Sequence, residues 1–299
     1  MNRPMQTLYT VLILCIPIWT LAQNTPVPPQ PTAIAGATTY VYKSVDGAEL
    51  RLHVFNPPHH RPTVTRPAIV FFFGGGWVRG TVEQFVPQSK HLAERGMIAI
   101  VADYRVFNRH QTSPFASMAD AKSAIRWVRA HAVELGIDPQ RIAASGASSG
   151  GHIALSAAVF DSFDEPQENK QISSKPNALV LFNPVVDTTD TTHDRWRELF
   201  GDRVRDASPI HHIGDGLPPT VIFHGTADTS VPFADVERFC TEAQARGNRC
   251  QLVGYEGAPH GFFNPQNEQR KWYRETLLEA DRFLTKLGYL SEPVPTQIP

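Results

Sequence analysis

The segment at 146–150 reads Gly-Ala-Ser-Ser-Gly, which fits the pattern G-x-S-x-G with Ser148 at its centre. An apolar run at 142–144 precedes it, and a second apolar stretch at 151–160 follows. In this pattern the serine stands on a sharp turn between a strand and a helix, where only small residues fit two positions away on either side. The alternative is an ordinary loop rich in glycine and serine. The flanking apolar runs favour Ser148 as a nucleophile.

A serine hydroxyl attacks a carbonyl only when a base takes its proton. The best candidate is His260 in the sequence GAPHGF, because it follows the last strand-like run and precedes a helical pattern. The pairs His59-His60 and His211-His212 are interpreted as solvent-facing or capping residues. No carboxylate or cysteine at matching spacing would complete a zinc site with either pair, so we expect no metal.

The base in turn needs a carboxylate that fixes its tautomer and stabilises the imidazolium. Asp228 in HGTAD directly follows the strand-like run TVIF, and Asp187 in NPVVD follows the run before it. The order serine, aspartate, histidine, with the acid after the penultimate strand, matches the hydrolase template and favours Asp228. In that case Asp187 is a hydrogen-bonded turn residue.

A tetrahedral oxyanion needs hydrogen-bond donors, and bare backbone amides suit this role. The sequence FGGGW follows the apolar run 68–73, so we predict an oxyanion hole made by the amides of Gly75, Gly76 and Ser149. The alternative is a flexible turn. No Lys-Ser/Thr follows as a phosphate-binding loop requires, and we expect no cofactor. Trp77 and Phe262 are predicted to wall the substrate pocket, with plain core packing as the alternative.

These candidates have to be positioned by a sheet. Apolar or alternating strand-like runs occur at 39–43, 50–55, 68–73, 98–101, 142–144, 178–182, 220–223 and 251–255, and Asp46-Gly47 is a hairpin signal between the first two. Helical patterns lie at 121–135, with Ser117 as a predicted cap, and at 233–246 and 271–287. Alternating strands and helices predict a mostly parallel eight-stranded sheet with helices on both faces. Active sites of such sheets gather at the carboxyl ends of the strands.

Residues 1–22 have a basic start, an apolar run and a small residue, Ala22, at their end. This is typical of a secretory signal peptide, and the apolar run is too short for a membrane span, which needs about 20 residues. We predict an exported protein with a proline-rich linker at 23–38, a catalytic domain at 39–290 and a flexible tail at 291–299. No membrane span is expected after cleavage.

Two cysteines, Cys240 and Cys250, remain after the predicted signal peptide. Export into an oxidising compartment favours a disulfide between them over two free buried thiols. The chain has 28 basic and 29 acidic residues and a net charge of −1, with no run of like charge, so a nucleic-acid partner is not expected.

The chain resembles the α/β-hydrolase superfamily, and within it the bacterial esterase/lipase group of hormone-sensitive-lipase-like and acetyl- or feruloyl-esterase-like enzymes. The resemblance covers about residues 40–288 and is carried by FGGGW, VADYR, GIDPQRI, GASSGG, HGTADTSVP and GAPHGF. It implies a triad of Ser148, Asp228 and His260. The hormone-sensitive-lipase pattern has histidine at position 73 and Gly-Asp-Ser-Ala-Gly around the serine, and this chain departs from both. No long insertion is expected after residue 182, and no large lid.

The function predicted from these residues is hydrolysis of short-chain acyl esters, including acetyl groups on carbohydrate, through an acyl-enzyme. The ester substrate is a small molecule or a group linked to a polysaccharide. A serine peptidase using the same triad is one alternative, although it normally needs a propeller or cap. A non-catalytic binding protein on the same scaffold is the other, and it predicts loss of a triad member, whereas all three are present.

Overall fold

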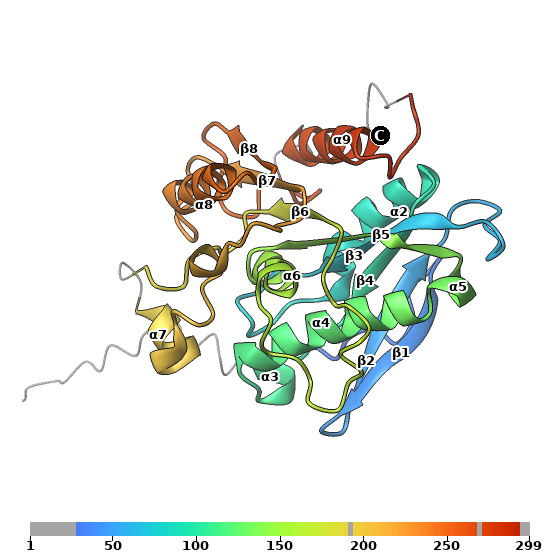
Figure 1. Cartoon of the computed structure of the whole chain (residues 1–299), viewed down its shortest axis with the longest axis horizontal. Coiled ribbons are helices and arrows are strands. Elements are labelled where there is room, and N and C mark those ends of the chain that lie inside the picture. The colour runs from blue at the N-terminus through green and yellow to red at the C-terminus, as the bar shows by residue number, and fades with distance from the viewer. Residues whose placement is uncertain (1–27, 191–193, 268–270, 294–299) are drawn as a thin grey trace, which may run out of the picture.

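The chain folds around one eight-stranded sheet. The computed structural model describes residues 28–190, 194–267 and 271–293. The strands are β1 (Thr38–Val45), β2 (Ala48–Phe55), β3 (Arg66–Phe72), β4 (Ile98–Ala102), β5 (Ile137–Ala147), β6 (Ala178–Phe182), β7 (Thr220–Gly225) and β8 (Cys250–Tyr255). All eight strands expected from the sequence are present, and the Asp46-Gly47 turn joins the first two (Figure 1).

The strand order across the sheet is β1-β2-β4-β3-β5-β6-β7-β8. β2 pairs antiparallel with both β1 and β4, and every pair from β4 to β8 is parallel. The central strands β3, β4 and β6, and β5 from Ile142 onward, are buried almost throughout, as strands covered on both faces must be, whereas in the edge strand β1 only Tyr42 is buried. This confirms the predicted mostly parallel sheet.

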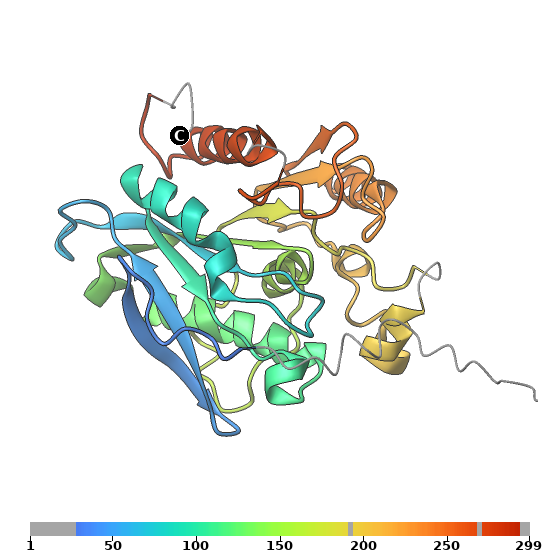
Figure 2. The same cartoon turned by 180° about the vertical axis from the view of Figure 1, so that it is seen from behind.

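Helices cover both faces of the sheet. α2 and α9 lie on one face, and α4, α6 and α8 lie on the other (Figures 1 and 2). The helices are α2 (Val86–Glu94), α3 (Phe107–His110), α4 (Pro114–Ala130), α5 (Ala132–Leu135), α6 (Ser149–Val159), α7 (Arg195–Phe200), α8 (Phe233–Ala245) and α9 (Lys271–Lys286), with 3-10 turns η1 (Val82–Phe85), η2 (Gly201–Arg203) and η3 (Pro209–His212). Within the described ranges, no helix is long and apolar enough to cross a membrane.

Two local features of the structure are not those predicted from the sequence. α4 begins at Pro114 rather than after Ser117, and the Ser117 hydroxyl donates to the carbonyl of Arg105 at 2.7 Å instead of capping the helix. Proline at the first helical position suits a helix start, since it has no N–H to satisfy there. The connection from β6 to β7, residues 183–219, carries α7, η2 and η3, which the sequence patterns do not predict.

Of the predicted segment boundaries, the one between residues 38 and 39 falls at the start of β1. The predicted signal peptide, residues 1–22, and the first five residues of the predicted linker lie outside the described residues. β1 begins at Thr38, and residues 28–37 form no helix or strand. At the other end Tyr289 and Leu290 are buried beyond the end of α9. Of the predicted tail, only 291–293 are described, and Ser291 accepts a hydrogen bond from Arg95 at 2.7 Å.

Cys240 of α8 and Cys250, the first residue of β8, form a disulfide. Both cysteines are buried. The bond ties the helix to the strand that follows it, at the end of β8 opposite the strand's carboxyl end.

Candidate active site

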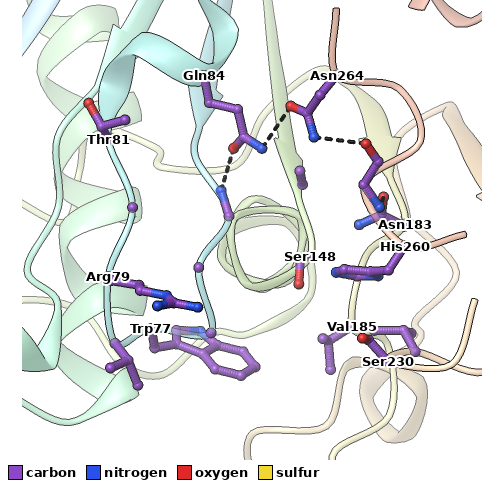
Figure 3. Close-up of a pocket in the computed structure, with 18 of the residues that line it drawn as sticks. Trp77, Arg79, Thr81, Gln84, Ser148, Asn183, Val185, Ser230, His260 and Asn264 are labelled. Carbon is purple, nitrogen blue, oxygen red and sulfur yellow. Dashed lines mark hydrogen bonds between the residues drawn. The ribbon is translucent and has the colours of Figure 1, made fainter. Parts of the chain in front are cut away.

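The predicted site residues lie at the carboxyl ends of parallel strands, where the chain leaves the sheet. The glycine triplet follows β3, Ser148 follows β5, Asp228 follows β7 and His260 follows β8. Ser148 and His260 both line a pocket of about 810 Å³, and their side chains lie beside one another in it (Figure 3). Residues more than a hundred positions apart therefore meet at one edge of the sheet.

Ser148 has the strained backbone of a nucleophile on a sharp turn, with φ 54° and ψ −120°. Close packing around it explains the glycines. A Cβ at Gly146 would lie 2.4 Å from the carbonyl carbon of Gly150, and a Cβ at Gly150 would lie 2.2 Å from the carbonyl oxygens of Phe72 and Phe73. The G-x-S-x-G spacing is thus a requirement of the turn. Within the described part of the chain, the Ser148 hydroxyl has no hydrogen-bond partner, so its proton is available to a base.

His260 is hydrogen-bonded to Asp228 through Nδ1, at 2.7 Å from Oδ2. Because an ionised carboxylate only accepts, Nδ1 carries the proton. The other nitrogen, Nε2, is then the basic atom available on the serine side of the ring. This is the tautomer that proton abstraction from Ser148 requires.

Asp228 is buried, and four donors surround its carboxylate. The amides of Ser230 and Val231 donate to Oδ1 at 2.8 and 2.9 Å, while His260 and the buried His224 approach Oδ2, His224 through Nε2 at 3.3 Å. Burial alone would raise the pKa of Asp228, but the hydrogen bonds from His224 and His260 outweigh burial and hold that pKa well below its ordinary value. The carboxylate therefore stays ionised opposite the imidazole.

Asp187 is occupied elsewhere and does not contact His260. Its Oδ1 accepts hydrogen bonds from the amide of Thr189 at 2.7 Å and the hydroxyl of Ser208 at 2.9 Å, and Arg238 pairs with Oδ2. These contacts are those of a hydrogen-bonded turn residue. Of the two candidate acids, Asp228 is therefore the one that contacts the histidine base.

The glycine loop after β3 lines the pocket. Gly75 and Gly76 adopt φ values of 140° and 66°, and a Cβ at Gly75 would lie 2.0 Å from the carbonyl oxygen of Arg79. Gly74 is different, because its amide donates to the side chain of Gln84 at 2.7 Å. No acceptor is found in the described ranges for the amides of Gly75, Gly76 and Ser149, which leaves them able to receive an oxyanion.

The two aromatic residues predicted to wall the pocket have different positions. Trp77 lines the pocket and packs edge-on against Trp196, with ring centroids 5.9 Å apart. Phe262 does not line it; the side chain is fully buried and packs against Tyr255 and Trp272. The prediction for Phe262 is wrong because this side chain packs in the core against Tyr255 of β8 and Trp272 of α9. The next residue, Phe263, lines the pocket instead.

A hydrogen-bonded bridge that the sequence did not reveal joins the glycine loop to the histidine loop. Gln84 accepts from the Gly74 amide and donates to Oδ1 of Asn264 at 3.2 Å, and Nδ2 of Asn264 donates to the carbonyl of Gly261 at 2.8 Å (Figure 3). The Gly261 amide also donates to Asn183 at 3.2 Å. Gln84 and Asn264 are 180 positions apart, and neither stands in a recognisable motif.

The histidine pairs make local contacts. His60 lies 2.9 Å from the carbonyl of Leu135 at the end of α5, and His212 lies 3.2 Å from the carbonyl of Arg205. His211 lies 3.1 Å from the hydroxyl of Thr189. The described residues contain no cluster of three or more His, Cys, Asp or Glu able to hold a metal ion.

A serine on a strained turn after a central strand, with its partners at the ends of later strands, defines the α/β-hydrolase esterase/lipase class. The chain belongs to the BD-FAE family, whose model matches residues 52–242.

Similar proteins of known structure are esterases. Thermogutta terrifontis esterase 2 phosphonylated by sarin is 47% identical with a TM-score of 0.84, covering 87% of this chain and 98% of that one. The propionate-bound form of that esterase is 48% identical with a TM-score of 0.83, covering 87% and 97%.

Curated relatives are more distant. A probable isoprenylcysteine alpha-carbonyl methylesterase, ICMEL1 of Arabidopsis thaliana, is 30% identical over 74% of this chain and 51% of its own length. Esterase LipC of Mycobacterium tuberculosis is 31% identical over 67% of this chain and 54% of its own length. The chain thus spans about half the length of the curated relatives it matches.

Proposed function

We propose that this protein is a carboxylesterase-type serine hydrolase that cleaves short-chain acyl esters through an acyl-enzyme, with Ser148, His260 and Asp228 as its triad. The observation that carries the proposal is the hydrogen bond from His260 to a buried, ionised Asp228, with the other side of the imidazole beside Ser148 (Figure 3). Membership of the BD-FAE family and the likeness to solved esterases support it.

The reaction follows from this arrangement. Nε2 of His260 takes the proton of Ser148 as the hydroxyl oxygen attacks the ester carbonyl. The resulting oxyanion is stabilised by the amides of Gly75, Gly76 and Ser149. Collapse breaks the bond to the alcohol, which leaves with the proton from His260. Water, deprotonated by the same imidazole, then attacks the acyl-enzyme, and the acid is released as Ser148 regains its proton.

The substrate we propose is an ester with a short acyl group, and acetyl groups on carbohydrate belong to this class. Solved forms of Thermogutta terrifontis esterase 2 hold propionate or butyrate, which supports short acyl chains here. Residues from both the glycine loop and the β6–β7 connection line the pocket.

We also propose export, with residues 1–22 as the signal peptide. The Cys240–Cys250 disulfide supports an oxidising destination, since such bonds persist outside the cytosol. N-terminal sequencing of the protein recovered from the periplasm or medium should find a mature chain that begins near Gln23. An uncleaved chain that stays in the cytosol would contradict this proposal.

The catalytic proposal is tested with Ser148→Ala and a matched control, Ser162→Ala, at an exposed residue that does not line the pocket. Wild type and the control should hydrolyse p-nitrophenyl acetate and butyrate, and a fluorophosphonate probe should label Ser148, as mapped by mass spectrometry. Ser148→Ala should lose turnover and labelling while keeping wild-type circular dichroism. Labelling of Ser148 with peptide but not ester cleavage would indicate a peptidase, and absence of labelling in the wild type would indicate a binding protein.

A further inference from the structure

We propose that residues 28–31, Pro-Pro-Gln-Pro, form the apolar wall against which the acyl group of the substrate lies. Residues 28–31 are the proline segment of this chain. The proposal rests on the proposed esterase function and adds a specificity-determining element to it. From the sequence this segment was expected to be only part of a linker between the signal peptide and the domain.

The first observation is the position of the segment. Pro28, Pro29 and Pro31 line the same pocket as Ser148 and His260. The segment precedes β1 and belongs to no helix or strand, so its place at the pocket is set by its contacts.

Those contacts attach the segment to the loop that carries the oxyanion amides. The Gln30 side chain donates from Nε2 to the carbonyl of Gly80 at 3.4 Å and accepts at Oε1 from the amide of Val82 at 3.2 Å. Gly80 is itself packed on the glycine triplet, because a Cβ there would lie 2.3 Å from the carbonyl oxygen of Gly74. Ile34 packs against the core a few residues later. The segment is therefore held at Gln30 and again at Ile34.

Proline suits a wall of this kind. Each proline presents an apolar ring and lacks a backbone N–H, so the wall offers no amide donors at three of its four positions. Proline-rich backbone is also stiff, so little conformational entropy is lost when a substrate packs against it. Each methylene moved from water onto such a surface favours binding by about fourfold.

The wall lies on the acyl side of the scissile bond. His260 must give its proton to the departing alcohol, so the alcohol has to lie next to the imidazole. The acyl chain then extends away from His260. Thr81, which stands between the two residues bonded by Gln30, lies across Ser148 from His260 (Figure 3). The proline segment is thus placed to contact the acyl group and not the alcohol.

Two variants test the proposal. A triple variant, Pro28→Gly with Pro29→Gly and Pro31→Gly, removes the rings, and Gln30→Ala keeps the rings but releases the segment. For each, kcat/KM is measured on p-nitrophenyl acetate, butyrate and hexanoate. The preference for butyrate over acetate should fall by roughly 3- to 10-fold in both variants, through a higher KM for butyrate, because up to two methylenes lose their apolar contact. The ratio of kcat/KM for methyl acetate to kcat/KM for butyl acetate should stay at its wild-type value, because these two esters differ only in the alcohol.

Pro58→Gly is the control, since Pro58 is an exposed proline outside the pocket, and it should keep the wild-type preference. Acyl preference within about twofold of wild type in the two pocket variants, less than the effect of one methylene, would overturn the proposal. A change confined to the alcohol series would also overturn it. If the wild type neither hydrolyses esters nor labels at Ser148, the esterase assignment itself has failed, which is a different result from an active enzyme with an unchanged preference.

Discussion

Asp228 receives the hydrogen bond of His260 at one oxygen and two backbone amides at the other. His224 adds a further contact. Its Nε2 lies 2.9 Å from the carbonyl of Val231 and 3.3 Å from Asp228, and since both neighbours only accept, Nε2 carries a proton. The result is a carboxylate whose charge and orientation are fixed before substrate arrives.

The first prediction concerns this carboxylate. Asp228→Asn should lower kcat by about 10³- to 10⁴-fold, because an amide can donate to Nδ1 of His260 and favour the wrong tautomer. KM for p-nitrophenyl butyrate should change little, since Asp228 does not line the pocket. The measurement is steady-state kinetics, with circular dichroism to show that the variant is folded. A kcat close to wild type would remove Asp228 from the triad.

At the scale of elements, the bridge through Gln84 and Asn264 connects η1 to the connection between β8 and α9. It therefore links the loop with the oxyanion amides to the loop with the base. Each loop leaves the sheet from a different strand. The sheet fixes where each loop begins, but it does not by itself fix the distance between the oxyanion amides and the base. A side-chain bridge between the two loops restricts this distance.

Gln84→Ala tests this positioning role. Loss of the bridge should lower kcat by roughly 10- to 100-fold with a much smaller change in KM, because small displacements of catalytic groups are costly. Gln84→Glu should recover part of the loss, since a carboxylate still accepts from the Gly74 amide but cannot donate to Asn264. Gln140→Ala, at an exposed glutamine outside the pocket, is the control. If Gln84→Ala turns over at the wild-type rate, the bridge has no positioning role.

α6 carries a histidine that makes stability depend on pH. His152 is fully buried beneath Trp77, with ring centroids 5.0 Å apart, and its Nε2 lies 2.7 Å from the carbonyl of Ala207. Burial lowers the pKa of His152 to about 4. The unfolded chain takes up this proton at an ordinary pKa of about 6.5, whereas the folded chain does not until about pH 4. Protonation therefore favours unfolding, and stability is lost as pH falls through that window.

His152→Gln should remove this dependence. The free energy of unfolding of the wild type should fall by about 3 kcal/mol more than that of the variant between pH 6.5 and 4, from about 1.4 kcal/mol per unit of pKa difference. Urea denaturation at several pH values measures both slopes. Parallel slopes for the two proteins would show that His152 does not contribute.

For the whole molecule, the catalytic residues and the disulfide lie at opposite ends of the strands. The site lies at the carboxyl ends of β3, β5, β7 and β8, whereas the disulfide lies at the start of β8. We therefore expect contacts at the far end of the strands to affect stability without moving the catalytic side chains.

Replacing both cysteines, Cys240→Ser with Cys250→Ser, tests that separation. The disulfide closes a loop with a sequence separation of 10, so its loss should lower the free energy of unfolding by about 3 kcal/mol. At temperatures where the variant is folded, kcat and KM should match the wild type. A reduced kcat in the folded variant would show that the two ends of the sheet are coupled.

The local chemistry and the type of sheet were predictable from the amino-acid sequence alone. Glycines around Ser148 were predictable because the turn excludes any Cβ, and the strands were predictable because buried parallel strands are continuously apolar. The chain order of the motifs then placed His260 and Asp228 after the correct strands, since parallel strands bring their carboxyl ends to one edge.

Contacts without a local sequence pattern are visible only in the folded protein. The direction of Phe262, the bridge from Gln84 to Asn264 and the place of residues 28–31 at the pocket all depend on how separate connections pack together. A strand or a nucleophile turn restricts its own backbone and so leaves a pattern in neighbouring residues. A contact between distant loops depends on how the two loops pack in space. It imposes no pattern on the neighbouring residues of either loop, so the sequence does not indicate it.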